Sequence, residues 1–291
     1  MAMQPDRTPR YAVIIPHYND TVRLARCLAA LMQNDTDDTE IVVVDNQSDT
    51  PLDALAAQYP SVRFVTEPSK GAAAARNRGV LETSAPCLFF LDADCVPTQG
   101  WLSAAKAAIT EDVVIGGRID VFDEGTGPRT GAQAFETVFA FDQRLYVEEH
   151  GFSVTANLLT TRAVFNDVGP LIVGVSEDVD WCRRATAKGY RLIYDDSVAV
   201  QHPTRADWGA LRKKWRRMTD EAFELKSAQP FGRLKWGLRA LAMPLSVIAH
   251  APRVITSQKL RSGRERLQAL MTLAQIRMTR LVWMLSQSIR P

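Results

Sequence analysis

Short apolar runs alternate with stretches of helical spacing through the first third of the chain. Fully apolar runs bounded by polar residues are typical of buried strands, whereas apolar positions three or four residues apart are typical of helices. The pattern predicts helices between the strands, and the strands themselves at 11–16, 40–45, 62–65 and 87–91. Because strand and helix alternate, we predict an α/β fold with a mostly parallel sheet flanked by helices.

Beyond residue 94 the alternation is less regular, but the same two signals remain readable. They predict three more strands, at 113–118, 191–194 and 198–202. The region 152–160 reads as a strand or an extended loop, and the helical pattern appears at about 132–147 and 175–188. These elements extend the α/β region to about residue 204.

Charge divides the chain into an acidic body and a basic tail. Residues 205–291 hold 18 Lys/Arg and 5 Asp/Glu, whereas residues 1–204 hold 17 Lys/Arg and 28 Asp/Glu. We therefore predict a catalytic domain at 1–204 and a helical, basic region at 205–291. The acidic body disfavours a nucleic-acid partner for the protein as a whole.

Two stretches of the tail have the pattern of basic amphipathic helices. They are 211–218, which includes Trp215, and 264–285, with apolar positions at helical spacing and four arginines nearby. Such helices bind anionic membrane surfaces. The alternative is a helical subdomain that packs on the catalytic domain with a solvated basic face. The apolar stretch 236–248 is too short and interrupted to predict a membrane span.

The cysteines and the amino terminus indicate in which cellular compartment the protein is expected. No CxxC pair occurs among Cys27, Cys87, Cys95 and Cys182, which argues against a zinc site and a disulfide framework. The first ten residues are polar, so we expect no secretory signal peptide. We expect a cytoplasmic protein, peripheral on the inner face of the cell membrane.

The strand at 87–91 ends in two carboxylates one residue apart, Asp92 and Asp94. In open α/β sheets, ligands bind at the carboxyl ends of the strands. Two carboxylates leaving a strand together can hold a divalent cation, and oxygen ligands of this kind suit Mg²⁺ or Mn²⁺. A polar turn is the alternative, since aspartate is common in turns.

Five further motifs surround this pair in a fixed order, and together they resemble glycosyltransferase family 2. The motifs span residues 11–202 with the aspartate pair, so the resemblance covers about two thirds of the chain. They are Ile15-Pro16-His17-Tyr18-Asn19, Val43-Val44-Asp45-Asn46-Gln47-Ser48, Gly71 to Gly79 with Arg76-Asn77, Gly100-Trp101-Leu102, and Glu177-Asp178-Val179-Asp180-Trp181.

The resemblance implies the GT-A fold, an inverting reaction and a nucleoside diphosphate sugar as donor, with a UDP-sugar expected. It assigns Asp94 to a Mn²⁺ or Mg²⁺ ion, and His202 as a second ligand. Relatives often carry a third acidic residue after the aspartate pair, but Cys95 stands here. The residues expected at the nucleotide or donor sugar are Pro16, Tyr18, Asn19, Asp45, Lys70, Arg76, Asn77, Asp92 and Ala93.

The acidic pair before Trp181 supplies the expected chemistry. Inversion is a single displacement that needs a carboxylate to take the acceptor hydroxyl's proton, and Asp178 is the expected general base. Glu177 is the alternative base or orients the acceptor, and Trp181 is expected to form an acceptor wall. A structural explanation remains open for each. Glu177 and Asp178 could be present only because acidic residues stabilise the amino terminus of a helix, and Trp181 could be a core residue.

The acceptor expected from the resemblance is a saccharide or a lipid-linked saccharide, and the expected product is cell-surface or exopolysaccharide. Two rival functions remain. A nucleotidyltransferase of similar fold would also use a metal and an aspartate pair, but usually has a Gly-rich phosphate loop that the segment after residue 16 lacks. A catalytically inactive, membrane-tethered protein that binds sugar nucleotides is the other.

Overall fold

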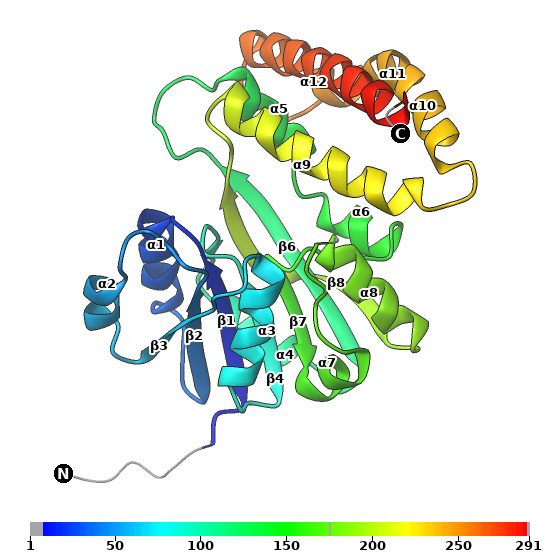
Figure 1. The fold of residues 1–291 in the computed structure, drawn as a ribbon. Coiled ribbons are helices and arrows are strands. Elements are labelled where there is room, and N and C mark those ends of the chain that lie inside the picture. Colours follow the sequence, from blue (N-terminus) through cyan, green and yellow to red (C-terminus); the bar gives the residue numbers. More distant parts are fainter. Residues whose placement is uncertain (1–7, 175, 290–291) are drawn as a thin grey trace, which may run out of the picture. The chain divides into compact units, whose positions relative to one another are not determined.

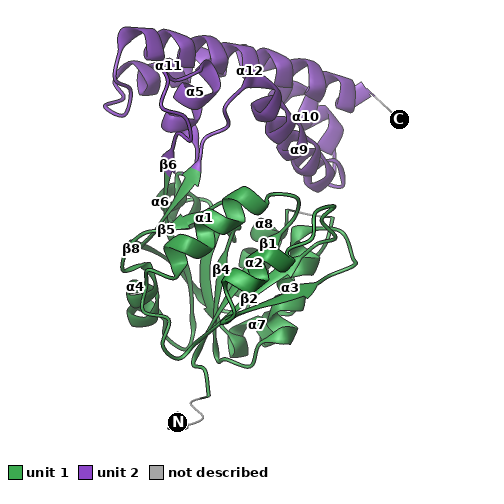
Figure 2. Ribbon diagram, turned by 90° about the vertical axis from the view of Figure 1, so that its left-hand side faces the viewer, with its two compact units in different colours: residues 1–120, 142–202 green, residues 121–141, 203–291 purple. Residues whose placement is uncertain are grey.

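The computed structural model describes residues 8–174 and 176–289, and the chain folds into two compact units (Figures 1 and 2). Unit 1 comprises residues 1–120 and 142–202, and unit 2 comprises residues 121–141 and 203–291. The observed break at 202/203 lies close to the boundary predicted at 204. Residues 121–141, which the sequence placed with the catalytic domain, instead belong to unit 2.

Unit 1 contains the predicted α/β region, built on an eight-stranded sheet. The strand order is β3-β2-β1-β4-β7-β6-β8-β5. The four strands at one side are mutually parallel and match the apolar runs within one or two residues. They are β1 (Tyr11–His17), β2 (Thr39–Asp45), β3 (Val62–Thr66) and β4 (Cys87–Leu91).

The other four strands make the sheet mixed. Antiparallel pairing joins β4 to β7, β7 to β6, and β5 to β8. The segment 191–203 is one long strand where the sequence predicted two. These strands are β5 (Val96–Pro97), β6 (Val113–Phe122), β7 (Asn157–Thr161) and β8 (Arg191–Pro203).

Single residues determine where a helix of unit 1 begins and how closely another packs on the sheet. Asp20 caps the first helix by accepting from the Arg23 amide. On α3, Gly79 permits close approach to the sheet, because a Cβ there would overlap the Ile14 side chain. The helices are α1 (Thr21–Leu31), α2 (Asp53–Gln58), α3 (Ala72–Glu82), α4 (Trp101–Ala108), α6 (Gln143–Glu148), α7 (Arg162–Val168) and α8 (Glu177–Ala187).

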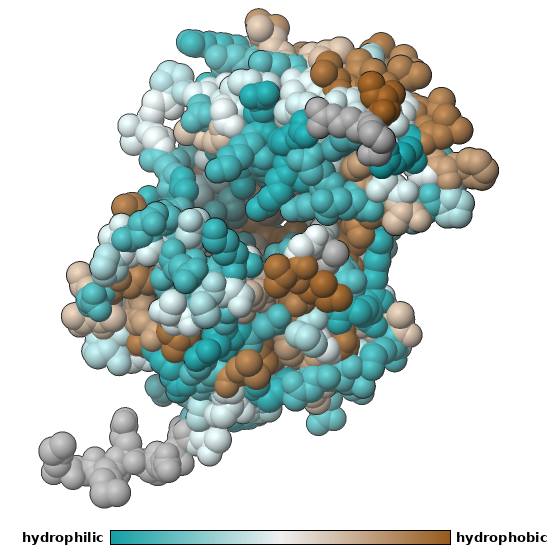
Figure 3. Space-filling view, viewed as in Figure 1, coloured by the Kyte–Doolittle hydropathy of each residue, from teal (hydrophilic) through white to brown (hydrophobic). Residues whose placement is uncertain are grey.

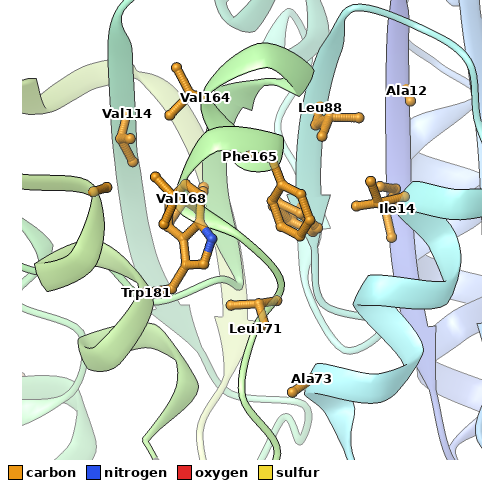
Figure 4. Close-up of a cluster of buried hydrophobic side chains, with 14 of the residues drawn as sticks. Ala12, Ile14, Ala73, Leu88, Val114, Val164, Phe165, Val168, Leu171 and Trp181 are labelled. Atoms are coloured by element: carbon orange, nitrogen blue, oxygen red, sulfur yellow. The ribbon is translucent and has the colours of Figure 1, made fainter. Parts of the chain in front are cut away.

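One large core cluster joins the parallel strands to α3, α7 and α8 (Figure 4). Ile14 and Leu88 from neighbouring strands are fully buried in it, together with Phe165 and Trp181 from the helices. Burying such side chains removes apolar area worth about 1.5–3 kcal/mol for each large aliphatic or phenyl group. The core therefore holds the strand ends and the amino terminus of α8 in fixed positions.

Unit 2 is helical. The helix predicted at 132–147 is divided by Phe141, whose φ of 52° does not continue a right-handed helix, so that α5 belongs to unit 2 and α6 to unit 1. The helices of unit 2 are α5 (Gly131–Phe139), α9 (Trp208–Ser227), α10 (Gly232–Leu241), α11 (Met243–Ile255) and α12 (Gly263–Ile289).

The basic residues of α9 and α12 are partly used inside unit 2. Lys214 donates to the buried Glu136 at 2.7 Å, and Arg205 pairs with the same carboxylate. Arg280 lies 4.9 Å from the centroid of the Trp215 ring. Much of the positive charge expected to face a membrane therefore contacts helices of its own unit.

Candidate active site

The predicted site residues form three contact groups in unit 1, at the strand ends of β1, β2 and β4 and at the start of α8. The first group surrounds Asp45 at the end of β2. Its Oδ1 lies 2.9 Å from His17 Nδ1 and accepts from the Ser48 hydroxyl at 2.6 Å. Burial alone would raise the pKa of Asp45, but the hydrogen bonds from Ser48 and His17 lower it below its usual value.

His17 is held in one tautomer by its two partners. Its Nε2 accepts a hydrogen bond from the Asp20 amide at 3.1 Å, so this nitrogen carries no proton. The ring proton then lies on Nδ1 and is donated to Asp45. His17 thus orients Asp45, whose remaining acceptor sites can receive a base N–H or a ribose hydroxyl.

The predicted loop after β1 is tied to the loop after β2. Asn19 has a φ of 50°, its backbone amide donates to Ser48, and its side chain donates to Asp49. Tyr18, between Pro16 and Asn19, is 61 % exposed. These contacts hold the loop in one shape and leave the Tyr18 ring facing solvent.

Asn46 connects the end of β2 to the predicted donor segment at Lys70-Gly71. Its amide donates to the Glu67 and Ser69 carbonyls and accepts from the Gly71 amide. All three contacts are 2.7–2.9 Å long, and Asn46 itself is buried. Asn46 therefore sets where α3 begins, with Lys70 exposed beside it.

The second group is centred on Arg76, whose side chain is 4 % exposed. Its guanidinium donates to Asp92 at 2.5 Å and to Glu177 at 3.2 Å. One cation thus joins the carboxylate after β4 to the acidic pair at the start of α8. These two pairs give Arg76 a structural role inside the site, while its buried Nε has no hydrogen-bond partner among the described residues. The predicted contact of Arg76 with the nucleotide stays a prediction.

Asp178 lies next to Glu177 and faces Thr155, just before β7. Its Oδ1 accepts from the Thr155 hydroxyl at 2.7 Å and from the Thr155 amide at 3.1 Å. Burial raises the pKa of Asp178 to about 6; Arg76 opposes this rise and Glu177 adds to it, and both effects are included in that value. A carboxylate with this pKa can accept a proton near neutral pH. Both printed bonds of Asp178 to the described residues involve Oδ1, which leaves Oδ2 as the candidate acceptor atom.

The third group is the pair Asp94 and His202, predicted as metal ligands. His202 Nε2 lies 3.1 Å from Asp94 Oδ2, although Asp94 lies in the turn between β4 and β5 and His202 lies near the end of β8. A carboxylate oxygen and an imidazole nitrogen at this distance are two candidate ligands for one divalent cation, and the carboxylate is the kind of ligand that Mn²⁺ and Mg²⁺ prefer. Among residues 8–174 and 176–289, no three His, Cys, Asp or Glu side chains form a metal cluster.

Two predicted site residues, Trp181 and Asn77, make structural contacts within unit 1. Trp181 is 1 % exposed, stacks on Phe165 and donates to the Gly169 carbonyl, so the predicted acceptor wall is wrong (Figure 4). Asn77 donates to the Leu171 carbonyl and accepts from the Leu171 amide. These two bonds tie residue 171 to α3, and the predicted contact of Asn77 with the donor stays a prediction. Ala93 is nearly buried between the two aspartates.

Three supporting residues were missed as site residues. His17 and Asn46 lie inside the quoted motifs, and their polar side chains directly at strand ends are a usable signal. Thr155 carries no such signal, because its contact with Asp178 bridges 23 positions and depends on how α8 packs.

Known proteins of similar sequence are glycosyltransferases. A family model described as "Glycosyl transferase family 2" matches residues 12–169. The glycosyltransferase AglE of Haloferax volcanii is 31 % identical over 221 residues, covering 72 % of this chain and 71 % of that protein. A pre-mycofactocin glycosyltransferase of Mycobacterium tuberculosis is 29 % identical over 210 residues, which cover 67 % of this chain and 44 % of its own length.

Solved structures show the same fold at low sequence identity. The mannosyltransferase PcManGT from Pyrobaculum calidifontis, solved with GDP-Man and Mn²⁺, is 17 % identical with a TM-score of 0.55, and the match covers 99 % of this chain and 75 % of that one. GalNAc-T7, solved with UDP, GalNAc and Mn²⁺, is also 17 % identical, with a TM-score of 0.54 over 69 % of this chain and 45 % of that one.

Proposed function

Because this chain belongs to glycosyl transferase family 2 and has the GT-A fold, we propose that it transfers a sugar, with inversion, from a nucleoside diphosphate sugar to an acceptor hydroxyl. The observation that carries the proposal is Arg76. One buried guanidinium joins Asp92, next to the metal-ligand pair, to Glu177, next to the expected base. Donor and acceptor groups thereby share one site.

The proposed reaction is a single displacement. An acceptor hydroxyl attacks the anomeric carbon, a new carbon–oxygen bond forms, and the bond to the diphosphate breaks. Asp178 takes the hydroxyl proton at Oδ2, while Thr155 holds Oδ1. Asp45 and His17 would bind the nucleotide, and Arg76 would orient Asp92 and Glu177. A cation held by Asp94 and His202 would neutralise the leaving diphosphate.

The donor and acceptor are proposed by class. A UDP- or GDP-sugar is supported by the solved relatives that contain UDP with GalNAc, or GDP-Man, together with Mn²⁺. Mn²⁺ is the first metal to test and Mg²⁺ the second. For the acceptor we propose a saccharide or a lipid-linked saccharide, in the synthesis of cell-surface polysaccharide or exopolysaccharide.

A nucleotide that binds the site with metal is expected to stabilise the native protein. At a concentration 100 times its Kd, the free energy of unfolding increases by about 2.7 kcal/mol, and Tm by about 5 °C. The measurement is Tm against a panel of nucleoside diphosphates, with and without Mn²⁺. Asp94→Asn should lose the Mn²⁺-dependent part of the increase.

Asp112→Asn is the matched control, since it makes the same charge change at an exposed loop before β6. It should keep the full increase in Tm. If no nucleotide stabilises well-folded wild-type protein with either metal, the transferase proposal fails. Stabilisation without turnover favours the inactive binding protein, and release of pyrophosphate in place of a nucleoside diphosphate favours the nucleotidyltransferase.

The pH dependence of kcat/KM tests Asp178 as the base. Because its pKa is about 6, the ionised base predominates above that pH and is lost below it. We expect kcat/KM to fall about tenfold for each pH unit below 6. The acidic limb should persist in Glu177→Gln. A limb with its midpoint near pH 4 in wild-type enzyme would contradict the assignment.

A further inference from the structure

The outward face of α10 and α11 carries a row of exposed aliphatic side chains. Leu238 is 60 % exposed, Leu245 is 67 % exposed and Ile248 is 73 % exposed. The other exposed members of this apolar face are Phe231, Leu234, Leu241 and Ile255. Figure 3 shows hydrophobic side chains gathered over these two helices at the upper right.

The opposite sides of the same helices are packed inside unit 2. Trp236, Ala240 and Met243 lie in a core cluster with Met284 of α12, and Val254 lies in a second cluster. The Trp236 indole also donates to Gln287 at 2.9 Å. The exposed leucines are therefore not needed for the fold, since α10 and α11 already have a buried face.

The segment that contains the apolar face carries basic residues and no acidic ones. Residues 225–264 contain eight Lys/Arg and no Asp or Glu. Arg233, Lys235 and Arg239 on α10 and Arg253 on α11 are exposed. An apolar face bordered by cations is typical of helices that lie in a membrane interface, and each cation near an anionic surface adds about 1 kcal/mol.

From these observations we infer that the apolar face of α10 and α11 docks unit 2 on an anionic lipid bilayer. The leucine and isoleucine side chains enter the boundary between headgroups and acyl chains, and the flanking arginines and lysines contact lipid phosphates. This assignment does not depend on the reaction proposed above. It moves the expected contact from the basic residues of α9 and α12 to α10 and α11, and it suits a peripheral protein on the cytoplasmic leaflet.

The bilayer contact is interfacial. Within the part of the chain that is described, no single helix is long and apolar enough to cross a membrane, and α10 with α11 passes the same test only as a pair bent by 55°. The bend and the packed face, with Trp236 and Val254 in core clusters, favour helices that lie along the surface.

The test is flotation of the full chain with phosphatidylcholine vesicles, either pure or mixed with phosphatidylglycerol. Wild-type protein should float with the anionic vesicles and much less with the neutral ones. Raising the salt from about 0.1 M to about 1 M should reduce binding, because the Debye length falls from about 10 Å to about 3 Å. The double substitution Leu238→Glu with Leu245→Glu should weaken binding at least about tenfold.

Leu81→Glu is the matched control, because Leu81 is 81 % exposed and lies on α3 of unit 1. It should bind vesicles like wild type. Circular dichroism and gel filtration show whether each variant is folded and monomeric. Failure of wild-type protein to bind anionic vesicles, or equal binding by the double variant, overturns the inference. So does a wild-type dimer that the double variant dissociates, since a second copy would then cover this face.

Discussion

Replacing Asp178 by asparagine is expected to lower kcat about a thousandfold, because loss of a general base typically costs a factor of 10²–10⁴. Asparagine keeps an oxygen that accepts from the Thr155 hydroxyl and amide, so local structure should be retained. The nucleotide-induced increase in Tm should also be retained, since the donor groups are unchanged. Steady-state kinetics and the Tm measurement together separate lost chemistry from lost binding.

Asp180→Asn is the control for this result. It makes the same chemical change two residues later, where the carboxylate forms a partly exposed i,i+4 pair with Arg184. Such pairs contribute little, so kcat should stay within about twofold of wild type. If Glu177→Gln were inactive while Asp178→Asn kept its activity, the base would be Glu177, and our assignment would be incorrect.

Replacing Arg76 by methionine is expected to lower the free energy of unfolding by about 3–5 kcal/mol at pH 8, because removing one partner of a buried ion pair leaves uncompensated charge. Asp92 and Glu177 would lose their shared cation, and Asp178 lies beside them. Because Arg76 lowers the pKa of Asp178, its loss raises that pKa, and Asp178 can then relieve part of the cost by binding a proton. The deficit should therefore be smaller at pH 5 than at pH 8, as measured by urea denaturation at both values.

Arg78→Met supplies the comparison within the same helix. Arg78 pairs with Glu82 at 2.6 Å, but its side chain is 40 % exposed. Exposed pairs contribute about 0–1 kcal/mol, so this variant should be nearly as stable as wild type at both pH values. The free energy of unfolding of Arg76→Lys should lie between those of Arg76→Met and Arg78→Met. Lysine keeps the positive charge but lacks the planar guanidinium that donates to two carboxylates at once. If the Arg76→Met and Arg78→Met variants had equal free energies of unfolding, the ion pairs of Arg76 with Asp92 and Glu177 would not stabilise the protein more than an exposed pair does.

The parallel strands and the residues that follow them could be read from the chain alone. A buried strand is encoded locally by its apolar run, so β1 to β4 were placed within one or two residues. Parallel strands also end at a common edge of the sheet. For this reason the positions of Asp45, Asp92 and Asp94 followed from the same pattern as the fold.

Side chains on helices were harder to assign, because the face that is buried depends on what packs there. Trp181 is one turn into α8 and reads equally well as an acceptor wall or a core residue, and packing against Phe165 decides between them. The family motif placed Arg76 at the nucleotide, and only the structure shows that its side chain on α3 pairs with Asp92 and Glu177. In unit 2, the basic residues suggested the membrane contact, but the exposed leucines of α10 and α11 were distinguishable only after the buried faces were known.

By itself, the sequence determined the α/β elements of unit 1, the family motifs and the candidate chemistry of Asp94 and Asp178, since each is written in a few adjacent residues. Only the tertiary structure decided that residues 121–141 belong to unit 2, that Thr155 holds Asp178, and that Arg76 joins two carboxylates. These features depend on contacts between segments far apart in the chain, whose energies arise from burial and pairing after folding and leave no local pattern to read.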